Sequence, residues 1–274
     1  MSSRRWVFAV AGVAVIASVA VWAALRHTAA RDVNDQAGSG EKITVRLYRN
    51  PAAVPALELQ DLDGRRISSA SWRGKVTIVN FWATWCPPCR AEIPDLIALQ
   101  TKYGDQLQVI GVSVDEGSVD AVRQFAQAQH INYPVVMSTP ELRKVFTGVN
   151  ALPTSFVLDR EERLVQRHVG MLNAGLTEAE TRVLAGLRVN ASVEEVDRAQ
   201  PLKLENAAQG TTIPGVDLAK LTPNRRTAAL MKLNAEPCTC GCELTVARCR
   251  VDDPRCGISL PIAQRIVQEI ADQP

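Results

Sequence analysis

The strongest constraint on the fold is a buried-strand pattern that runs into a pair of cysteines. The segment Val76–Trp82 consists almost entirely of β-branched and aromatic residues, which is typical of a central strand buried on both faces. Cys86-Pro87-Pro88-Cys89 follows shortly after, and apolar residues then recur at helical spacing over residues 87–103. The sequence therefore predicts a strand, a short turn, and a helix that begins at the two cysteines.

This placement gives the cysteine pair a chemical role. The amino end of a helix offers unpaired N–H groups and a partial positive charge, which favour a thiolate at Cys86. We predict that Cys86 is the nucleophile and that Cys89, one turn further, resolves the mixed disulfide. A structural disulfide and half of a zinc site are the alternatives, but no histidine lies near the pair and the next cysteine is Cys238. The context favours redox catalysis.

The two intervening prolines bear on the direction of that redox chemistry. Neither Pro87 nor Pro88 has an N–H group to donate to the Cys86 sulfur. A less stabilised thiolate means a less stabilised reduced form, so we predict a reducing couple.

Two further positions fit thiol exchange. Glu92 lies three residues after Cys89 on the same helical face, where a partly buried carboxylate could accept the proton of the resolving thiol. The alternative for Glu92 is a solvated surface residue. Pro153, in Leu152-Pro153-Thr154, stands at the start of a predicted strand and is a plausible cis site, although the sequence alone leaves cis and trans open.

The pattern downstream predicts an α/β sandwich. Strands alternate with helices and a closing antiparallel pair follows, in the order strand 107–113, helix 118–129, strand 133–137, helix 140–147, and strands 154–159 and 163–169. A last helix is expected to begin at Thr177, whose hydroxyl would form a capping box with Glu180.

In these motifs the chain resembles the membrane-anchored, periplasmic thioredoxin-like reductases of the TlpA/ResA type. The segments that carry the resemblance are Val79–Pro94, around the cysteine pair, and Leu152–Asp159, which matches the cis-proline strand of those proteins. The resemblance covers about residues 51–187. One departure from thioredoxin itself is Asn80, which stands where thioredoxin has a buried aspartate, so Glu92 becomes the expected proton acceptor.

The resemblance implies a thioredoxin-like fold and the reduction of protein disulfides, as in cytochrome c maturation. It implies that Cys86 and Cys89 form the redox-active disulfide, that Glu92 is the acid/base, and that Pro153 is a cis-proline presenting backbone to the substrate. We assign substrate binding to the residues around these positions, namely Trp85, Pro87, Pro88, Leu152 and Pro153. No cofactor is expected for catalysis, and the expected partners are a disulfide-bearing protein and a membrane-bound electron donor.

The predicted organisation has five parts. They are a membrane anchor or signal over residues 1–25, a tether over 26–50, a thioredoxin-like domain over 51–187, a linker over 188–221 and a helical cysteine-rich module over 222–274.

The amino-terminal part contains the uncharged stretch Trp6–Leu25, which is long enough to span a bilayer as a helix. An uncleaved anchor in the bacterial inner membrane is the main expectation, with the catalytic domain on the periplasmic side. A signal peptide removed near Thr28-Ala29-Ala30 is the alternative.

The balance of charged residues argues against nucleic acid as a binding partner. The chain has 31 Lys and Arg against 29 Asp and Glu, so it lacks the basic excess of a nucleic-acid-binding protein.

A peroxiredoxin-like peroxidase is a competing enzyme hypothesis, and a metal-handling protein that uses the second cysteine group is a non-enzymatic one. In a peroxiredoxin we expect a threonine three residues before the reactive cysteine, whereas Thr84 is two before Cys86.

The second cysteine group lies near the carboxyl end and is open in function. Its members are Cys238, Cys240, Cys242, Cys249 and Cys256, and no histidine accompanies them. An exported protein favours disulfides, so we predict two disulfides and one remaining thiol. Four thiolates binding Zn²⁺ or Cu(I), or a redox relay to Cys86 and Cys89, are the alternatives.

Overall fold

The computed structural model describes residues 43–198 and 208–272. Within these ranges no helix is long and apolar enough to cross a membrane. The predicted anchor, Trp6–Leu25, lies outside the described residues.

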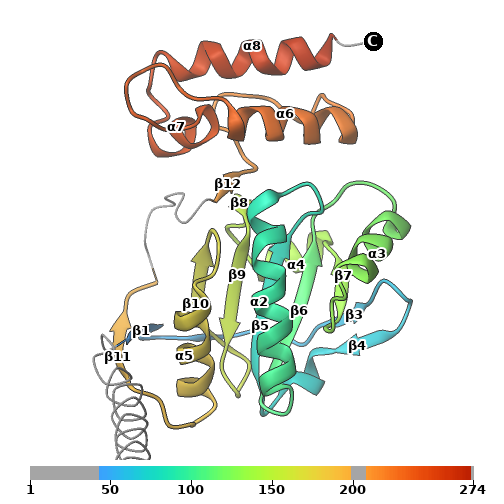
Figure 1. The fold of residues 1–274 in the computed structure, drawn as a ribbon, viewed down its shortest axis with the longest axis vertical. Coiled ribbons are helices and arrows are strands. Elements are labelled where there is room, and N and C mark those ends of the chain that lie inside the picture. The colour runs from blue at the N-terminus through green and yellow to red at the C-terminus, as the bar shows by residue number, and fades with distance from the viewer. Residues whose placement is uncertain (1–42, 199–207, 273–274) are drawn as a thin grey trace, which may run out of the picture. The chain divides into compact units, whose positions relative to one another are not determined.

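A mixed six-stranded sheet forms the centre of the thioredoxin-like domain (Figure 1). Its strands are, in order across the sheet, β2 (Ala52–Ala53), β10 (Arg163–Val169), β9 (Thr154–Leu158), β5 (Val76–Trp82), β6 (Leu107–Ser113) and β7 (Val135–Met137). The pairs β5–β6 and β6–β7 are parallel, whereas β5–β9, β9–β10 and β10–β2 are antiparallel. All seven residues of β5 are buried, as the sequence predicted.

Helices cover both faces of this sheet. Their bounds are η2 (Ser69–Trp72), α2 (Pro87–Tyr103), α3 (Val119–Ala128), α4 (Pro140–Val145) and α5 (Ala174–Leu184). Asn80 of β5 bonds to Glu92 of α2, and Trp82 on the same face stacks on Phe125 of α3. In Figure 1, α2 and α5 lie in front of the sheet.

The opposite face of the sheet carries a cluster of three phenylalanine rings. Because side chains alternate along a strand, Phe81 points away from α2. It packs edge-on against Phe146, which caps the end of α4, and against Phe156 of β9, with ring centroids 6.0 and 5.7 Å away. All three rings are at most 1% exposed. This cluster fixes α4 to the sheet.

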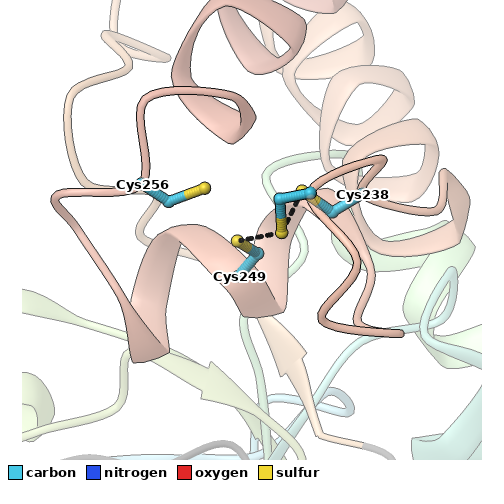
Figure 2. Close-up of side chains that lie close together, drawn as sticks. Cys238, Cys249 and Cys256 are labelled. Carbon is cyan, nitrogen blue, oxygen red and sulfur yellow. Dashed lines mark hydrogen bonds between the residues drawn. The ribbon is translucent and has the colours of Figure 1, made fainter.

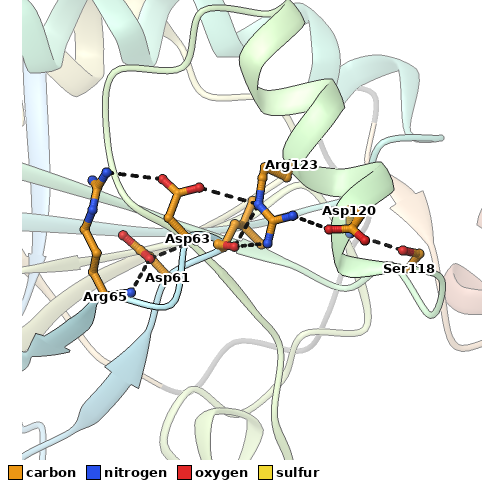
Figure 3. A network of polar contacts seen from close by, with 7 residues as sticks. Asp61, Asp63, Arg65, Ser118, Asp120 and Arg123 are labelled. Atoms are coloured by element: carbon orange, nitrogen blue, oxygen red, sulfur yellow. Dashed lines mark hydrogen bonds and ion pairs between the residues drawn. The ribbon is translucent and has the colours of Figure 1, made fainter.

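A polar network joins a hairpin to α3 (Figure 3). The strands β3 (Glu58–Gln60) and β4 (Arg66–Ser68) pair antiparallel, and the turn between them is held by the Asp61 carboxylate, which accepts from the N–H groups of Asp63 and Arg65. Arg123 of α3 pairs with Asp63 and Asp120 and donates to a hairpin carbonyl. Side chains therefore hold the turn at residues 61–64, and α3 is anchored to it.

Strands occur in both segments that the sequence predicted as tether and linker. β1 (Ile43–Tyr48) pairs in parallel with β11 (Ala191–Val196), from Ile43 opposite Ala191 to Tyr48 opposite Val196. Val45 is fully buried there. The sequence does not reveal this pairing, because the two strands lie 148 residues apart. β1 has an apolar face formed by Ile43, Val45 and Leu47, but nothing in the sequence marks β11 as its partner.

The predicted start of α5 was wrong. The helix begins at Ala174, and the Asn173 side chain caps it by accepting from the Leu176 N–H at 2.9 Å. Thr177 lies inside the helix and donates to the Asn173 carbonyl, while Glu180 is buried beside His168, 3.0 Å from its Nε2. The asparagine four residues earlier is the stronger N-cap.

The cysteine-rich module has a core of its own. It contains α6 (Pro223–Ala235), α7 (Val246–Asp252) and α8 (Ser259–Ala271), and the strand β12 (Gln209–Gly210) precedes them. Because Ile213, Leu218 and Leu221 belong to its core, the module begins before residue 222, where the sequence placed its start. β12 pairs antiparallel with β8 (Ala151–Leu152) of the thioredoxin-like domain. Buried apolar side chains from all three helices, including Leu233, Val246 and Ile266, form the core together with Cys238 and Cys249.

Removal of the Phe156 ring tests the aromatic cluster. We expect Phe156→Ala to lower the free energy of unfolding by about 3–5 kcal/mol, because it leaves a cavity among Phe81 and Phe146. Urea denaturation followed by tryptophan fluorescence measures it. Val193→Ala, at a side chain 52% exposed in β11, is the control and should change stability by less than about 0.5 kcal/mol. Equal effects would contradict this packing.

Candidate active site

The cysteine pair lies at the start of α2, just after the central strand β5 ends. Cys86 is the N-cap residue of α2, Pro87 and Pro88 occupy its first turn, and Cys86 and Cys89 are joined by a disulfide. Proline is tolerated at these positions because the first N–H groups of a helix have no partner within it. The Cys89 N–H donates to the Cys86 sulfur at 3.3 Å. The strand, turn and helix predicted from the sequence are all present.

The turn that carries Cys86 is held from the neighbouring strand. Asp115, just after β6, accepts from the Thr84 N–H at 3.0 Å and from the Thr84 hydroxyl at 2.6 Å. The Ser113 hydroxyl donates to the same carboxylate at 2.8 Å. Sequence reasoning missed Asp115, because nothing in the chain signals that the ends of β5 and β6 share a carboxylate before their pairing is known.

Glu92 lies beneath the disulfide end of α2 and is 1% exposed. Its Oε1 accepts from the Asn80 amide at 2.7 Å and its Oε2 from the Leu172 N–H at 2.9 Å. Burial raises the pKa of Glu92 to about 7, and these two donors oppose the rise only in part. The buried carboxyl predicted from the sequence is confirmed, and the solvated alternative is wrong.

Asn80 orients the Glu92 carboxyl. Its side-chain amide donates both to Glu92 and to the Ser155 hydroxyl, at 2.7 and 2.9 Å. It thereby joins α2 to β9 through β5. The sequence indicated only that Asn80 cannot itself carry a proton; it did not reveal that this amide orients the group that can.

The Leu152–Pro153 peptide bond is cis, which settles the question that the sequence left open. Thr154, the next residue, lies opposite Phe81 in the β5–β9 pairing, so Pro153 stands at the same end of the sheet as the cysteine pair. The Pro153 carbonyl accepts from the Gly170 N–H at 2.7 Å.

The predicted substrate-binding residues are largely covered in this structure. Pro88, Leu152 and Pro153 are buried, and Trp85 is half-buried against both the domain core and the module core, whereas Pro87 is exposed. The two cysteines beside them, Cys86 and Cys89, are 0% exposed. Gln209 of β12 lies opposite Leu152, directly before the cis-proline. Asn234 of α6 holds β12 from the other side, accepting from the Gly210 N–H and donating to its carbonyl at 2.8 and 2.9 Å.

Comparison with known proteins agrees with this geometry. The AhpC/TSA family model matches residues 51–167. The thioredoxin-like protein YneN of Bacillus subtilis (strain 168) is 34% identical over 121 residues, which make up 43% of this chain and 71% of YneN. The thiol-disulfide oxidoreductase ResA of Bacillus thuringiensis (strain Al Hakam) is 32% identical over 118 residues, or 43% of this chain and 68% of ResA.

The chain belongs to the ResA-like thiol-disulfide oxidoreductases of the thioredoxin family. A thiol:disulfide interchange protein from Chlorobium tepidum TLS is also similar, with 36% identity, 50% of this chain and 98% of that chain covered, and a TM-score of 0.48. The family model ends at residue 167, so it does not extend to the cysteine-rich module.

The module cysteines differ from the disulfide prediction. All five are free, and the two disulfides that we predicted are not present. The sulfurs of Cys238, Cys240, Cys249 and Cys256 converge on one point instead of pairing, and Cys242 is exposed beside them. Only the number and spacing of these cysteines can be read from the sequence, whereas the fold of α7 and its flanking loops decides where the sulfurs lie.

Replacement of Glu92 tests its position beneath the disulfide. We expect Glu92→Gln to keep the fold, since the glutamine amide oxygen can still accept one of the two hydrogen bonds. Disulfide exchange should slow by about 10²-fold near pH 7, because no carboxylate is left to take the Cys89 proton. Stopped-flow tryptophan fluorescence from pH 5 to 9 measures the rate. Glu178→Gln, on α5, is the control; identical pH–rate profiles for Glu92→Gln and the wild type would contradict the role.

Weakening the attachment of β12 tests whether this strand limits access to Cys86. Asn234→Ala removes two hydrogen bonds that hold β12, together worth about 1–3 kcal/mol. We expect alkylation of reduced Cys86 by iodoacetamide to accelerate roughly tenfold if β12, which pairs with the strand that leads into the cis-proline, limits access to the site. Gln268→Ala, in α8, should react as the wild type does. An unchanged rate for Asn234→Ala would show that β12 does not limit access.

Proposed function

We propose that this oxidoreductase acts as a reductase of disulfides in other proteins. The observation that carries the proposal is the cysteine pair at the start of α2 above a buried carboxyl with a raised pKa. This combination supplies a nucleophile, a second thiol within one helical turn, and a proton acceptor.

The proposed reaction uses the reduced, dithiol form. The Cys86 thiolate attacks one sulfur of the substrate disulfide, and the other substrate sulfur leaves as a thiolate. Cys89 then gives its proton to the Glu92 carboxylate and attacks the Cys86 sulfur, which releases the second substrate thiolate. Two electrons pass from the cysteine pair to the substrate, and the pair is left as the Cys86–Cys89 disulfide.

The cis-proline region offers the docking edge for the substrate chain. The backbone beside Pro153 stands at the same end of the sheet as Cys86, and Leu152 lies in an edge strand that can pair with an added chain. Trp85, Pro87 and Pro88 surround the pair and would supply apolar contact. Since β12 occupies this edge, a substrate has to displace it.

We further propose that the reaction takes place on the periplasmic face of the inner membrane, in a role of the cytochrome c maturation type, with a membrane-bound electron donor. The uncharged stretch Trp6–Leu25 supports an anchor. The peroxidase alternative has less support, because Ala83 holds the position three before Cys86.

The direct test is turnover with a protein disulfide. The full chain should reduce insulin with dithiothreitol as donor, and Cys86→Ser should abolish this activity while Cys242→Ser leaves it unchanged. Insulin reduction that survives Cys86→Ser would overturn the proposal.

The redox potential tests the direction of electron flow. Pro87 and Pro88 have no N–H group to donate, whereas the Cys89 N–H donates to the Cys86 sulfur. We therefore expect a potential nearer to thioredoxin at about −270 mV than to the oxidant DsbA at about −120 mV. Equilibration in glutathione or dithiothreitol buffers measures it. A value near that of DsbA would contradict a reductase.

A further inference from the structure

The module brings four sulfur atoms to one place (Figure 2). Cys238 and Cys240 lie in the loop after α6, Cys249 lies in α7, and Cys256 lies in the loop between α7 and α8. All four sulfurs are within 4.8 Å of one another, and Cys238 and Cys249 are buried. Side chains from three separate segments thus point into one small volume.

The spacing of these sulfurs fits a metal better than disulfides. A tetrahedral zinc with Zn–S bonds of about 2.3 Å separates its sulfurs by about 3.8 Å. The Cys240 sulfur is 3.3 Å from that of Cys238, 3.8 Å from that of Cys249 and 2.9 Å from that of the exposed Cys242, which lies outside the group of four. A disulfide needs about 2.05 Å. Four mutually close sulfurs also leave no unique choice of two pairs.

The loop around Cys238 and Cys240 is shaped by backbone contacts. The Cys238 N–H donates to the Leu244 carbonyl at 2.8 Å, and Pro237 and Thr245 form an antiparallel bridge. Gly241 takes a φ of +86°, which a glycine adopts without strain and which turns the chain back after Cys240. This closed turn presents two sulfurs side by side and leads directly into α7, which carries the third.

A buried cation holds the fourth ligand in place. Arg250 is 2% exposed and donates to the carbonyls of Pro214, Pro254 and Cys256 at 3.0, 2.7 and 3.2 Å. It therefore fixes the loop that carries Cys256. A divalent metal with four thiolates has a net charge of −2, so the adjacent guanidinium would offset part of that charge.

We propose that Cys238, Cys240, Cys249 and Cys256 bind one Zn²⁺ ion as a structural tetrathiolate site. An all-sulfur donor set selects Zn²⁺ or Cu(I), and four sulfurs in a closed tetrahedron are the arrangement of structural zinc sites. Such a site would stabilise a module whose small core is built from three short helices. Cys242, exposed next to the site, is not a ligand.

Elemental analysis of the full chain, purified anaerobically without chelators, tests this proposal. We expect one zinc per chain, retained in Cys242→Ser and in a Cys86→Ser/Cys89→Ser double variant, and lost in Cys249→Ser. The double variant shows that the metal does not come from the catalytic pair, so this result does not depend on the proposed reductase function.

A second measurement avoids reliance on a variant that could fail to fold. The wild-type chain with Co²⁺ in place of zinc should show the intense visible absorption of a tetrahedral cobalt tetrathiolate. Stoichiometric copper without zinc, or two disulfides among the five cysteines by thiol counting under denaturing, non-reducing conditions, would overturn the proposal. A weak octahedral cobalt spectrum would overturn it as well.

Discussion

The positions of the active-site groups depend on one strand, β5. β5 is hydrogen-bonded to β6 on one edge and to β9 on the other, and it is buried on both faces. Its alternation turns Asn80 toward α2 and Phe81 toward the aromatic cluster. A register shift of one residue would exchange these two side chains, placing an amide among phenyl rings and removing the donor from Glu92. The strand therefore has one acceptable register.

The register of β5 brings the cysteine pair, the cis-proline and Glu92 to the same end of the sheet. β5 leads into the turn bearing Cys86, which is why the cysteine pair lies at this end of the sheet. β9 begins opposite Phe81, so the cis-proline before it lies at the same end. Glu92 lies on α2, and its burial raises its pKa to about 7, a rise that the hydrogen bonds from Leu172 and Asn80 and the charge of His168 oppose only in part. A carboxyl with these partners can exchange a proton at physiological pH.

Much of this could be predicted from the sequence, because local patterns carry it. The apolar run of β5, the cysteine spacing and the helical stripe of α2 each lie within one segment. The N–H of Leu172 and the carboxylate of Asp115 could not be predicted, because each meets its partner only through the tertiary fold. The pairing of β1 with β11 was missed for the same reason. In the module, composition favoured disulfides, whereas the folded positions of the sulfurs favour a common centre.

The proposed mechanism depends most on the ionisation of Glu92, and a carbon-13 NMR titration measures this ionisation directly. The side-chain carboxyl signal of Glu92 in the labelled, oxidised full chain can be assigned by its loss in Glu92→Gln. Because burial favours the neutral form, the carboxyl should stay protonated through pH 5 and titrate with a midpoint near 7. A midpoint near the ordinary value of 4.5 would show that Glu92 is a much weaker base than its burial implies and would contradict its role as the proton acceptor for Cys89.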